Sequence, residues 1–414
     1  MSVDPIRARR LVLAAALIGL VLRLAFAFGY WVDKPLTHDE REYLALARSL
    51  TLGKGFTYDL PPNASDTPRF GRAPGYPAFL AIVGGGSEPF DATPPQVKIA
   101  QSVTGTIGVL LVATLARRAA GHRAGIVAAW GAAVYPPLVW ICAYVFSEAL
   151  FSTVALAAAL LLNVALDRGN GQRSSLAWTI AAGMMTGLAM LVRPAMTFFL
   201  PVAVVWLIVR RRPVVAAVLA AGAVMVVGPW TARNLHVYHR LVPIASEGGV
   251  TFWTGNHPLA TGEGDMAANP AIKISEIAFR RSHPGLTQEE LEPLYYREAL
   301  SYIAAHPVWW TGLLLKKVFY TVVPVGASYA LHSPLYRTSS IASSLIVLPL
   351  GVLGGVMWWR RPHPPESLFP LALSAVIVCI LFFPQERFRI PVIDPALIIC
   401  VGVWYAHREG GRED

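Results

Sequence analysis

Charged residues are scarce in this sequence. They make up 14% of its 414 residues, whereas soluble domains carry about a quarter. Hydrophobic residues make up 55%. This composition excludes an ordinary soluble domain and predicts a protein embedded in a membrane. The formal net charge of +10 does not by itself indicate nucleic-acid binding, because the cytoplasmic loops of membrane proteins collect lysine and arginine.

Two further features are missing. The three cysteines, Cys142, Cys379 and Cys400, each lie inside an apolar run, which excludes a disulfide framework and a cysteine metal site. The nucleotide-binding pattern GxxxxGK(S/T) is also absent, since the glycines at 84–86 precede Ser87 and no lysine follows. Any group transfer must therefore draw its free energy from the substrate itself.

Long apolar runs dominate what remains. A helix needs roughly 20 apolar residues to cross a bilayer. The first run is too long for the core of a signal peptide and has no small-residue cleavage site after it, so we expect an anchor helix. A shorter apolar piece at 76–86 is expected to lie at the interface. The predicted spans are 11–30, 97–116, 124–142, 148–166, 175–192, 196–209, 213–230, 341–359, 368–384 and 391–407.

Basic clusters orient these spans. The arginines at 210–212 and 360–361 should face the cytoplasm, and ten spans place them there together with both termini. The segment 308–326 holds Lys316 and Lys317 near its middle, which is costly in hydrocarbon. We therefore predict that this segment is interfacial or re-entrant and lies on the outer side.

The fold class expected from this pattern is an all-α polytopic membrane protein. A single membrane domain covers 1–414. Two large regions, 31–96 and 231–307, lie outside the membrane, and the first contains juxtamembrane helices. The cytoplasmic loops are short and leave little room for chemistry, so a site is predicted on the outer face.

The stretch THDEREY at 37–43 follows the first span closely. Its spacing predicts a helix from Asp39 to Leu52, with Asp39 in the first turn, where the helix dipole favours an anion. One interpretation is a capped interfacial helix without chemistry. The other makes Asp39 and Glu40 a catalytic acidic pair. A carboxylate at the water line can take a proton from an attacking hydroxyl while a lipid-borne leaving group stays in the bilayer.

Short motifs follow this acidic pair in a fixed order. They are GKGF at 53–56, RAPGYPAFL at 72–80, PWTARN at 229–234, FWTGNHP at 252–258 and ERFRIP at 386–391. The ordered set resembles the C-type (GT-C) integral-membrane glycosyltransferases, from Arg10 to about Tyr405. It is most similar to the branch with the dolichyl-phosphate-mannose–protein mannosyltransferases and the bacterial aminoarabinose transferases.

The resemblance implies a fold and a reaction. The expected fold is GT-C, with about ten transmembrane helices and interfacial helices in two outer loops. The expected donor is a polyprenyl-phosphate-linked sugar, transferred with inversion to a hydroxyl of a glycan, lipid or protein acceptor of the cell envelope. Asp39 matches the catalytic carboxylate of the first outer loop, and Glu40 lies beside it. The expected location is a bacterial inner or plasma membrane.

Cations near the donor phosphate are also expected. Arg387 and Arg389 follow the ninth span. They could snorkel at a helix end, but two arginines in a short turn favour a phosphate clamp, since the guanidinium fork suits phosphate. Arg72 could bind the same phosphate or only order the Pro-Gly turn after it. Lys316 could reach the phosphate or anchor an interfacial helix. Arg23, inside the first span, is interpreted as a structural partner for a buried carboxylate.

Other side chains are candidate substrate contacts. Glu148 follows Ser147 at the outer end of a span, so it is either a site acid or a helix-start acid. The motif FWTGNHP could stack on sugar rings or pack internally. The predicted substrate-binding residues are Tyr43, Tyr76, Glu148, Trp253, Asn256 and His257.

Two questions stay open at this point. No cofactor is certain. A divalent metal could use His38, Asp39, Glu40 and His257, although HExxH-type spacing is absent. The alternatives to a transferase are a transporter or flippase and a polymerase of lipid-linked saccharides. The lack of a two-fold repeat and the gathering of polar residues at the outer edge favour the transferase.

Overall fold

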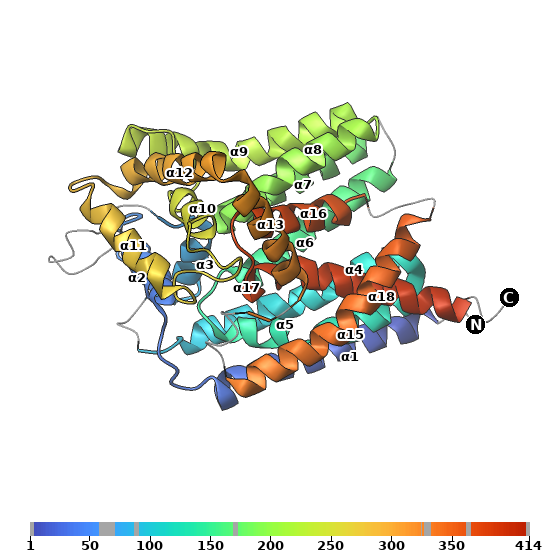
Figure 1. Cartoon of the computed structure of the whole chain (residues 1–414). Coiled ribbons are helices and arrows are strands. Elements are labelled where there is room, and N and C mark those ends of the chain that lie inside the picture. Colours follow the sequence, from blue (N-terminus) through green and yellow to red (C-terminus); the bar gives the residue numbers. More distant parts are fainter. Residues whose placement is uncertain are drawn as a thin grey trace.

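The computed structural model describes residues 4–57, 71–86, 91–168, 173–323, 325–326, 333–361 and 366–410. Within these ranges every regular element is a helix, which confirms the all-α prediction (Figure 1). The helices at the apolar runs are α1 (Pro5–Ala25), a π-helix (Phe26–Tyr30), α4 (Pro95–Val134), α6 (Glu148–Asp167), α7 (Arg173–Val192), α8 (Phe199–Val209), α9 (Pro213–Tyr238), α15 (Pro334–Trp359), α16 (Leu368–Leu381) and α18 (Ile393–Gly410).

The remaining helices are shorter or lie in the two predicted outer regions. They are α2 (His38–Thr51), α3 (Gly75–Ile82), α5 (Pro136–Trp140), α10 (Gly248–Gly255), α11 (Pro270–Arg281), α12 (Gln288–Ala305), α13 (Pro307–Val322) and α17 (Glu386–Arg389). Two 3-10 helices, Ile141–Ala143 and Pro194–Phe198, complete the set in the described ranges.

In the part of the chain that the structure describes, six helices are long and apolar enough to cross a membrane. They are Pro5–Tyr30, Pro95–Val134, Glu148–Asp167, Ser175–Val192, Pro213–Tyr238 and Pro334–Trp359, and the shorter apolar helices are Pro194–Val209 and Leu368–Leu381. The predicted spans all fall on helical segments, but the count of ten stays a prediction.

Helix α4 contains the predicted span 97–116 and the first part of the span 124–142, which continues through α5 and the 3-10 helix Ile141–Ala143. Its backbone leaves the helical region at Ala120 and at Gly121, where φ is 82°. Glycine adopts this left-handed conformation without the steric cost of a side chain. The break divides α4 where the sequence separates the runs 97–116 and 124–142.

Arg23 has a different partner from the one predicted. It is 1% exposed. Its Nη1 donates to Gly19 O at 2.9 Å and its Nη2 to Ala132 O at 3.3 Å. Ala132 lies in the last turn of α4, where carbonyl groups lack helical partners and the helix dipole favours a cation. The interpretation of Arg23 as the partner of a buried carboxylate is therefore corrected: it caps a helix end.

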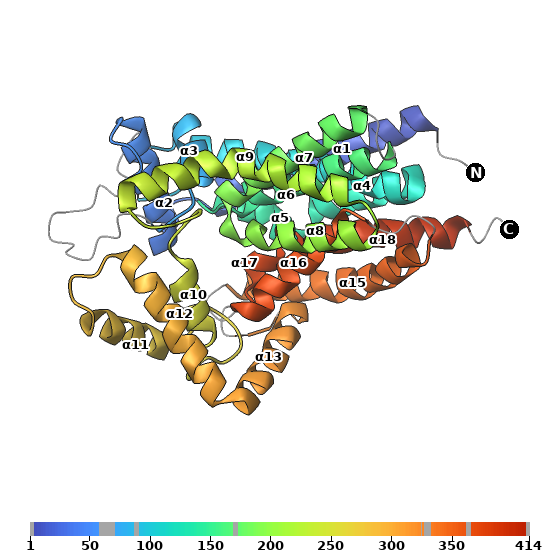
Figure 2. The same ribbon diagram turned by 90° about the horizontal axis from the view of Figure 1, so that it is seen from above.

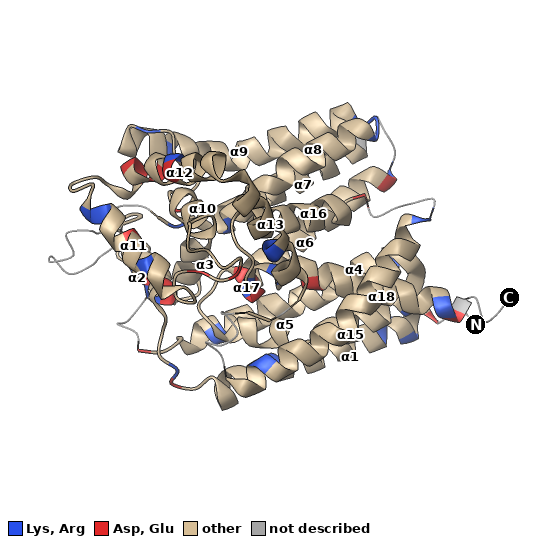
Figure 3. Ribbon diagram, in the orientation of Figure 1, with Lys and Arg blue, Asp and Glu red and all other residues tan. Residues whose placement is uncertain are grey.

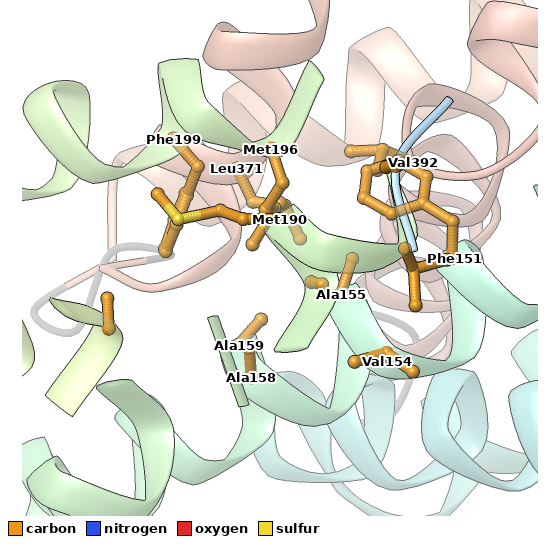
Figure 4. Packing of buried hydrophobic residues seen from close by; sticks show 14 of the residues in the cluster. Phe151, Val154, Ala155, Ala158, Ala159, Met190, Met196, Phe199, Leu371 and Val392 are labelled. Carbon is orange, nitrogen blue, oxygen red and sulfur yellow. The ribbon is translucent and has the colours of Figure 1, made fainter. Parts of the chain in front are cut away.

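The long helices form two packed groups joined in the middle (Figure 1). Helices α7 and α8 pack on α9, while α1 and α18 pack on α4 and α15 packs on α18. Helix α6 contacts both α4 and α7. Figure 4 shows one apolar core, in which Phe151 of α6 lies beside Val392 and Met190 lies beside Leu371, with the small residues Ala155 and Ala159 of α6 in the same cluster.

Small residues permit this close packing. A Cβ atom at Gly354 of α15 would lie 1.8 Å from Cys400 O of α18. A Cβ atom at Gly183 of α7 would lie 2.4 Å from Leu219 O of α9. Both distances are impossible for real atoms, so these helix pairs require glycine at their crossing points.

The charged segments gather at the two ends of the helix bundle and around α13 and α17 (Figure 3). Helices α2, α3 and α10 to α12 lie at one end, and the two chain termini lie at the other (Figure 1, Figure 2). Arg210 and Arg118 form ion pairs with Glu366 and Asp167 near the terminal end. Helix α2 therefore lies at the same end of the bundle as the helices of the second predicted outer region.

Helix α13 covers most of the segment predicted to be interfacial or re-entrant. It has 16 residues, fewer than the roughly 20 that a span needs. Lys317 is completely buried and its Nζ donates to Asn256 Oδ1 at 3.0 Å. Lys316 is exposed. Burial lowers the pKa of Lys317 to about 7.

This shift predicts a pH-dependent stability. Between pH 7 and the ordinary lysine pKa of about 10.4, the unfolded chain carries a proton that the folded chain lacks. The free energy of unfolding therefore rises with pH in this window, by at most about 1.4 kcal/mol per unit. Thermal unfolding in detergent should show this rise in the wild type and a smaller one in Lys317→Met. Equal pH slopes in the two proteins would contradict the assignment.

Candidate active site

Helix α2 begins inside the acidic stretch, and its first turn fixes Glu40. Glu40 Oε2 accepts from Thr37 N at 2.8 Å, while Thr37 Oγ1 accepts from Glu40 N. This reciprocal pair is a capping box. The other oxygen, Oε1, accepts from Val145 N at 2.9 Å. Burial raises the pKa of Glu40, although hydrogen bonds from Thr37 and Val145 oppose the shift. These contacts commit both carboxylate oxygens of Glu40 to neighbouring parts of the chain, and its place in a catalytic pair stays a prediction.

Asp39 lies between two arginines from distant parts of the chain. Its Oδ1 accepts from Arg72 Nη2 at 2.7 Å, and its Oδ2 accepts from Arg387 Nη1 at 2.9 Å. Arg72 precedes α3, and Arg387 lies on α17. The Asp39 side chain is 28% exposed. Three of the residues predicted from the sequence thus meet at one point.

The two arginines determine the charge state of Asp39. Burial alone would raise its pKa, but the positive charges of Arg72 and Arg387 outweigh burial and hold it well below its usual range. The carboxylate is therefore ionised throughout the physiological pH range. In this arrangement it is also a weak base, because protonation would cost it two charge-assisted hydrogen bonds.

Arg72 connects three carboxylates. Besides Asp39, its Nε donates to Glu42 Oε2 at 2.8 Å, and its Nη1 lies 3.2 Å from Glu247 Oε2. The guanidinium also lies over the ring of Tyr43, 5.0 Å from its centroid. Burial lowers the pKa of Arg72, but Glu247 and the other carboxylates outweigh this and raise it.

The motif around Arg72 explains its position. Gly75, at the start of α3, lies against the end of α7, where a Cβ atom would be 2.8 Å from Leu191 O. Only glycine permits this approach without displacing one of the two helices. The two predictions for Arg72, that it orders the Pro-Gly turn and that it lies in the site, are therefore compatible. The turn holds its guanidinium next to Asp39.

Arg387 is held by aromatic rings as well as by acids. Its guanidinium lies 5.3 Å from the ring centroid of Phe146 and 5.4 Å from that of Phe388. Its Nη2 lies 3.5 Å from Asp265 Oδ2. Stacking on both rings suits the planar guanidinium and fixes its orientation.

A third arginine completes the cluster. Arg193, at the end of α7, pairs with Glu148 Oε1 at 2.8 Å and donates to Ser147 Oγ at 3.1 Å. It also lies over Phe388, 4.9 Å from the ring centroid. Glu148, a predicted substrate contact, is 1% exposed. It is therefore the counter-charge of Arg193, and both Arg193 and Arg387 lie over the ring of Phe388.

Sequence reasoning missed four residues of this cluster. Glu42 lies one helical turn after Asp39 and could have been found from that spacing. Arg193 precedes a proline, a pattern that a simple turn between two spans explains equally well. Glu247 and Asp265 lie in the second outer region without a recognisable motif. Their function follows only from the folded positions of Arg72 and Arg387.

The two predicted tyrosines have different environments. Tyr43 lies under Arg72, and burial raises its pKa to about 12. Its ring contacts Tyr76 edge-on, with centroids 4.9 Å apart. Tyr76 is completely buried and donates to Gln101 Oε1 at 2.9 Å. Tyr43 thus contacts the charged cluster directly, whereas Tyr76 packs against Tyr43 and contacts the cluster through it.

Trp253, Asn256 and His257 pack inside the second outer region. Trp253 is 2% exposed and belongs to a core with Tyr295. Asn256 accepts from Lys317 Nζ and from Trp310 Nε1, both at 3.0 Å. The ring of His257 contacts Trp253 at 4.4 Å between centroids. These contacts match the packing interpretation, and contact of these residues with a sugar stays a prediction.

The candidate metal ligands do not gather. Among the residues that the structure describes, no three His, Cys, Asp or Glu side chains lie close enough to hold a metal ion. His38 Nε2 lies 3.2 Å from Glu42 Oε1 on the same helix. The oxygens of Asp39 accept from arginines instead. The chemistry offered by this cluster is that of a carboxylate and guanidinium groups.

Comparisons with known proteins give a family-model match over part of the chain. Residues 73–231 match the family model described as dolichyl-phosphate-mannose-protein mannosyltransferase. This range begins directly after Arg72 and ends within α9. No curated protein sequence matches the chain significantly.

Solved structures show the same fold. The archaeal oligosaccharyltransferase AglB from Archaeoglobus fulgidus, in complex with an inhibitory peptide and a dolichol-phosphate, matches with a TM-score of 0.60 and 15% identity over 98% of this chain and 52% of that chain. The same organism's enzyme tethered with an acceptor peptide matches with a TM-score of 0.62 and 15% identity, over 99% of this chain and 50% of that chain. The present chain thus spans about half the length of these oligosaccharyltransferases.

A weaker likeness is to ArnT from Cupriavidus metallidurans bound to undecaprenyl phosphate, with a TM-score of 0.41 and 14% identity over 99% of this chain and 79% of that chain. The family-model match and the shared fold confirm the resemblance to GT-C glycosyltransferases that the motifs predicted.

Proposed function

We propose that this protein transfers a sugar from a polyprenyl-phosphate-linked donor to an acceptor hydroxyl at the outer membrane face, with inversion. Asp39 acts as the general base, and Arg387 and Arg72 receive the donor phosphate. The observation that carries this proposal is the position of Asp39 between those two arginines, 2.7 and 2.9 Å away.

The comparisons support a lipid-phosphate donor. The family model names dolichyl-phosphate-mannose, and the AglB structure holds a dolichol-phosphate and a peptide. Those ligands belong to the relatives. For this chain, the independent support is a pair of guanidinium groups at the end of the bundle where the outer regions gather.

The proposed step conserves atoms and charge. The acceptor oxygen attacks C1 of the sugar from the face opposite the phosphate, and its proton passes to Asp39. The C1–O bond breaks, and its electron pair leaves with the polyprenyl phosphate. Arg387 and Arg72 stabilise the charge that develops on the phosphate oxygens. Asp39 later releases its proton to water, which completes the cycle.

The resting contacts suggest how the base is activated. Asp39 is a weak base while both arginines bind it. A donor phosphate competes for the same guanidinium donors, so its arrival removes hydrogen bonds from Asp39 and raises the pKa of the carboxyl group. Proton abstraction by Asp39 would therefore become favourable only after the donor is bound.

A reconstituted assay tests this proposal. The protein is placed in liposomes with radiolabelled undecaprenyl- or decaprenyl-phosphate sugars and a crude envelope extract. Label should move onto an extract component with the wild type. Label that only changes leaflet would contradict the proposal and indicate a transporter. The sugars compared are mannose, arabinose, galactose and glucose, and the one transferred identifies the donor.

A further inference from the structure

We propose that Arg389 and Glu386 are positioning residues that hold Arg387 in the site, and that Arg389 itself does not bind the donor phosphate. This inference rests on the proposed function of Arg387. It revises the two-arginine clamp that the motif ERFRIP predicts, because it assigns one arginine to the ligand and the other to the scaffold.

The geometry of α17 separates the two arginines. The helix has four residues, Glu386 to Arg389. Side chains two residues apart on a helix do not face the same side. Arg387 is 23% exposed and turned to Asp39. Arg389 is 4% exposed. Only one of them can therefore meet a ligand that enters beside Asp39.

Each of the three guanidinium nitrogens of Arg389 already donates a hydrogen bond. Its Nε and Nη2 both donate to Asp394 Oδ1, at 3.2 and 3.0 Å. Its Nη1 donates to Val322 O at 3.0 Å. Asp394 belongs to α18, and Val322 is the last residue of α13. A phosphate would have to break a buried ion pair to reach this guanidinium, which is strongly unfavourable.

Glu386 anchors the other end of the short helix. It is 7% exposed, and its Oε1 accepts from Ser340 Oγ of α15 at 2.5 Å. Burial raises the pKa of Glu386 to about 7, against the hydrogen bond from Ser340. Anchors to α13, α15 and α18 thus surround α17. A helix of this length has too few internal hydrogen bonds to be stable on its own. These anchors therefore determine the position of the Arg387 backbone, from which its side chain reaches Asp39.

A double-mutant cycle on polyprenyl-phosphate binding tests the inference. Arg387→Ala should weaken binding by about 10- to 100-fold, as for loss of a charge-assisted contact. Arg389→Lys should weaken it by about 3- to 10-fold in the wild-type background and by no further factor in Arg387→Ala, because it acts through Arg387. Independent, multiplicative losses would overturn the inference and make Arg389 a direct ligand.

A second variant separates the two explanations further. Asp394→Asn alters the anchor but removes no cation from the site. It should weaken phosphate binding as Arg389→Lys does. If Asp394→Asn leaves the affinity unchanged while Arg389→Lys weakens it, Arg389 binds phosphate directly.

Backbone hydrogen exchange gives a measure that needs no ligand. Amides 386–390 should exchange faster in Arg389→Lys and Asp394→Asn than in the wild type, while amides of α6 keep their protection. Unchanged exchange at 386–390 would overturn the inference even if binding falls. If the wild type binds polyprenyl phosphate no better than polyprenyl alcohol, the proposed function fails, and this exchange result still decides whether α17 is anchored as described.

Discussion

Replacing Asp39 by asparagine is expected to lower the transfer rate by about 100- to 10,000-fold, the usual contribution of a general base. Donor binding should not weaken. The neutral amide competes less strongly than the carboxylate for Arg72 and Arg387, so their donors become more available to phosphate. Steady-state kinetics with the purified protein in liposomes should show the loss in kcat, with the KM for the donor unchanged or lower.

The matched control is Asp91→Asn, which removes one exposed carboxylate outside the cluster. Its kinetics should equal those of the wild type. If Asp39→Asn retains full transfer in well-folded protein, Asp39 is not the base. If it loses donor affinity and rate together, the carboxylate acts in binding and the proposed division of functions is wrong.

The second large effect is expected at Arg72. Removing its guanidinium leaves Asp39, Glu42 and Glu247 close together without their shared cation. Loss of one partner from a largely buried ion pair costs about 3–5 kcal/mol. Arg72→Ala should therefore unfold at a clearly lower temperature and lose transfer, and low salt should make both effects larger because screening is weaker.

Arg72→Lys distinguishes charge from geometry. Lysine keeps the positive charge, but its three donors share one nitrogen and cannot span three carboxylates as the guanidinium does. It should restore most of the thermal stability and little of the transfer. Equal rescue of both would show that only the charge matters. A stable, active Arg72→Ala variant would contradict the assigned connecting function.

Much of the architecture could be predicted from hydrophobic runs, because backbone groups in a bilayer must be paired within helices. Only part of the candidate site could be predicted from the sequence. Arg72 and Arg387 could be predicted because each lies within a motif, and Asp39 could be predicted because the ordered motifs resemble a known family. Glu40 could have been separated from Asp39, since the Thr37 to Glu40 spacing is that of a capping box.

Other features depend on contacts between distant segments. Glu247 and Asp265 lie in a region without a motif, and nothing in their neighbours indicates that Arg72 and Arg387 lie opposite them. The sequence also does not reveal that Arg389 forms a buried ion pair with Asp394. An arginine in a short turn between apolar runs has the same local pattern whether it binds a ligand or a buried acid.

A donor labelled separately in the sugar and in the phosphate tests the central claim most directly. Wild-type protein in liposomes, supplied with this donor and an active acceptor fraction, should move the sugar label to the acceptor. The phosphate label should remain in polyprenyl phosphate, in equal amount, and Asp39→Asn should slow both changes by about 100- to 10,000-fold. If the two labels stay together, whether on the other leaflet or on the acceptor, the protein does not break the bond between C1 and the phosphate oxygen, and it is not a transferase of the proposed kind.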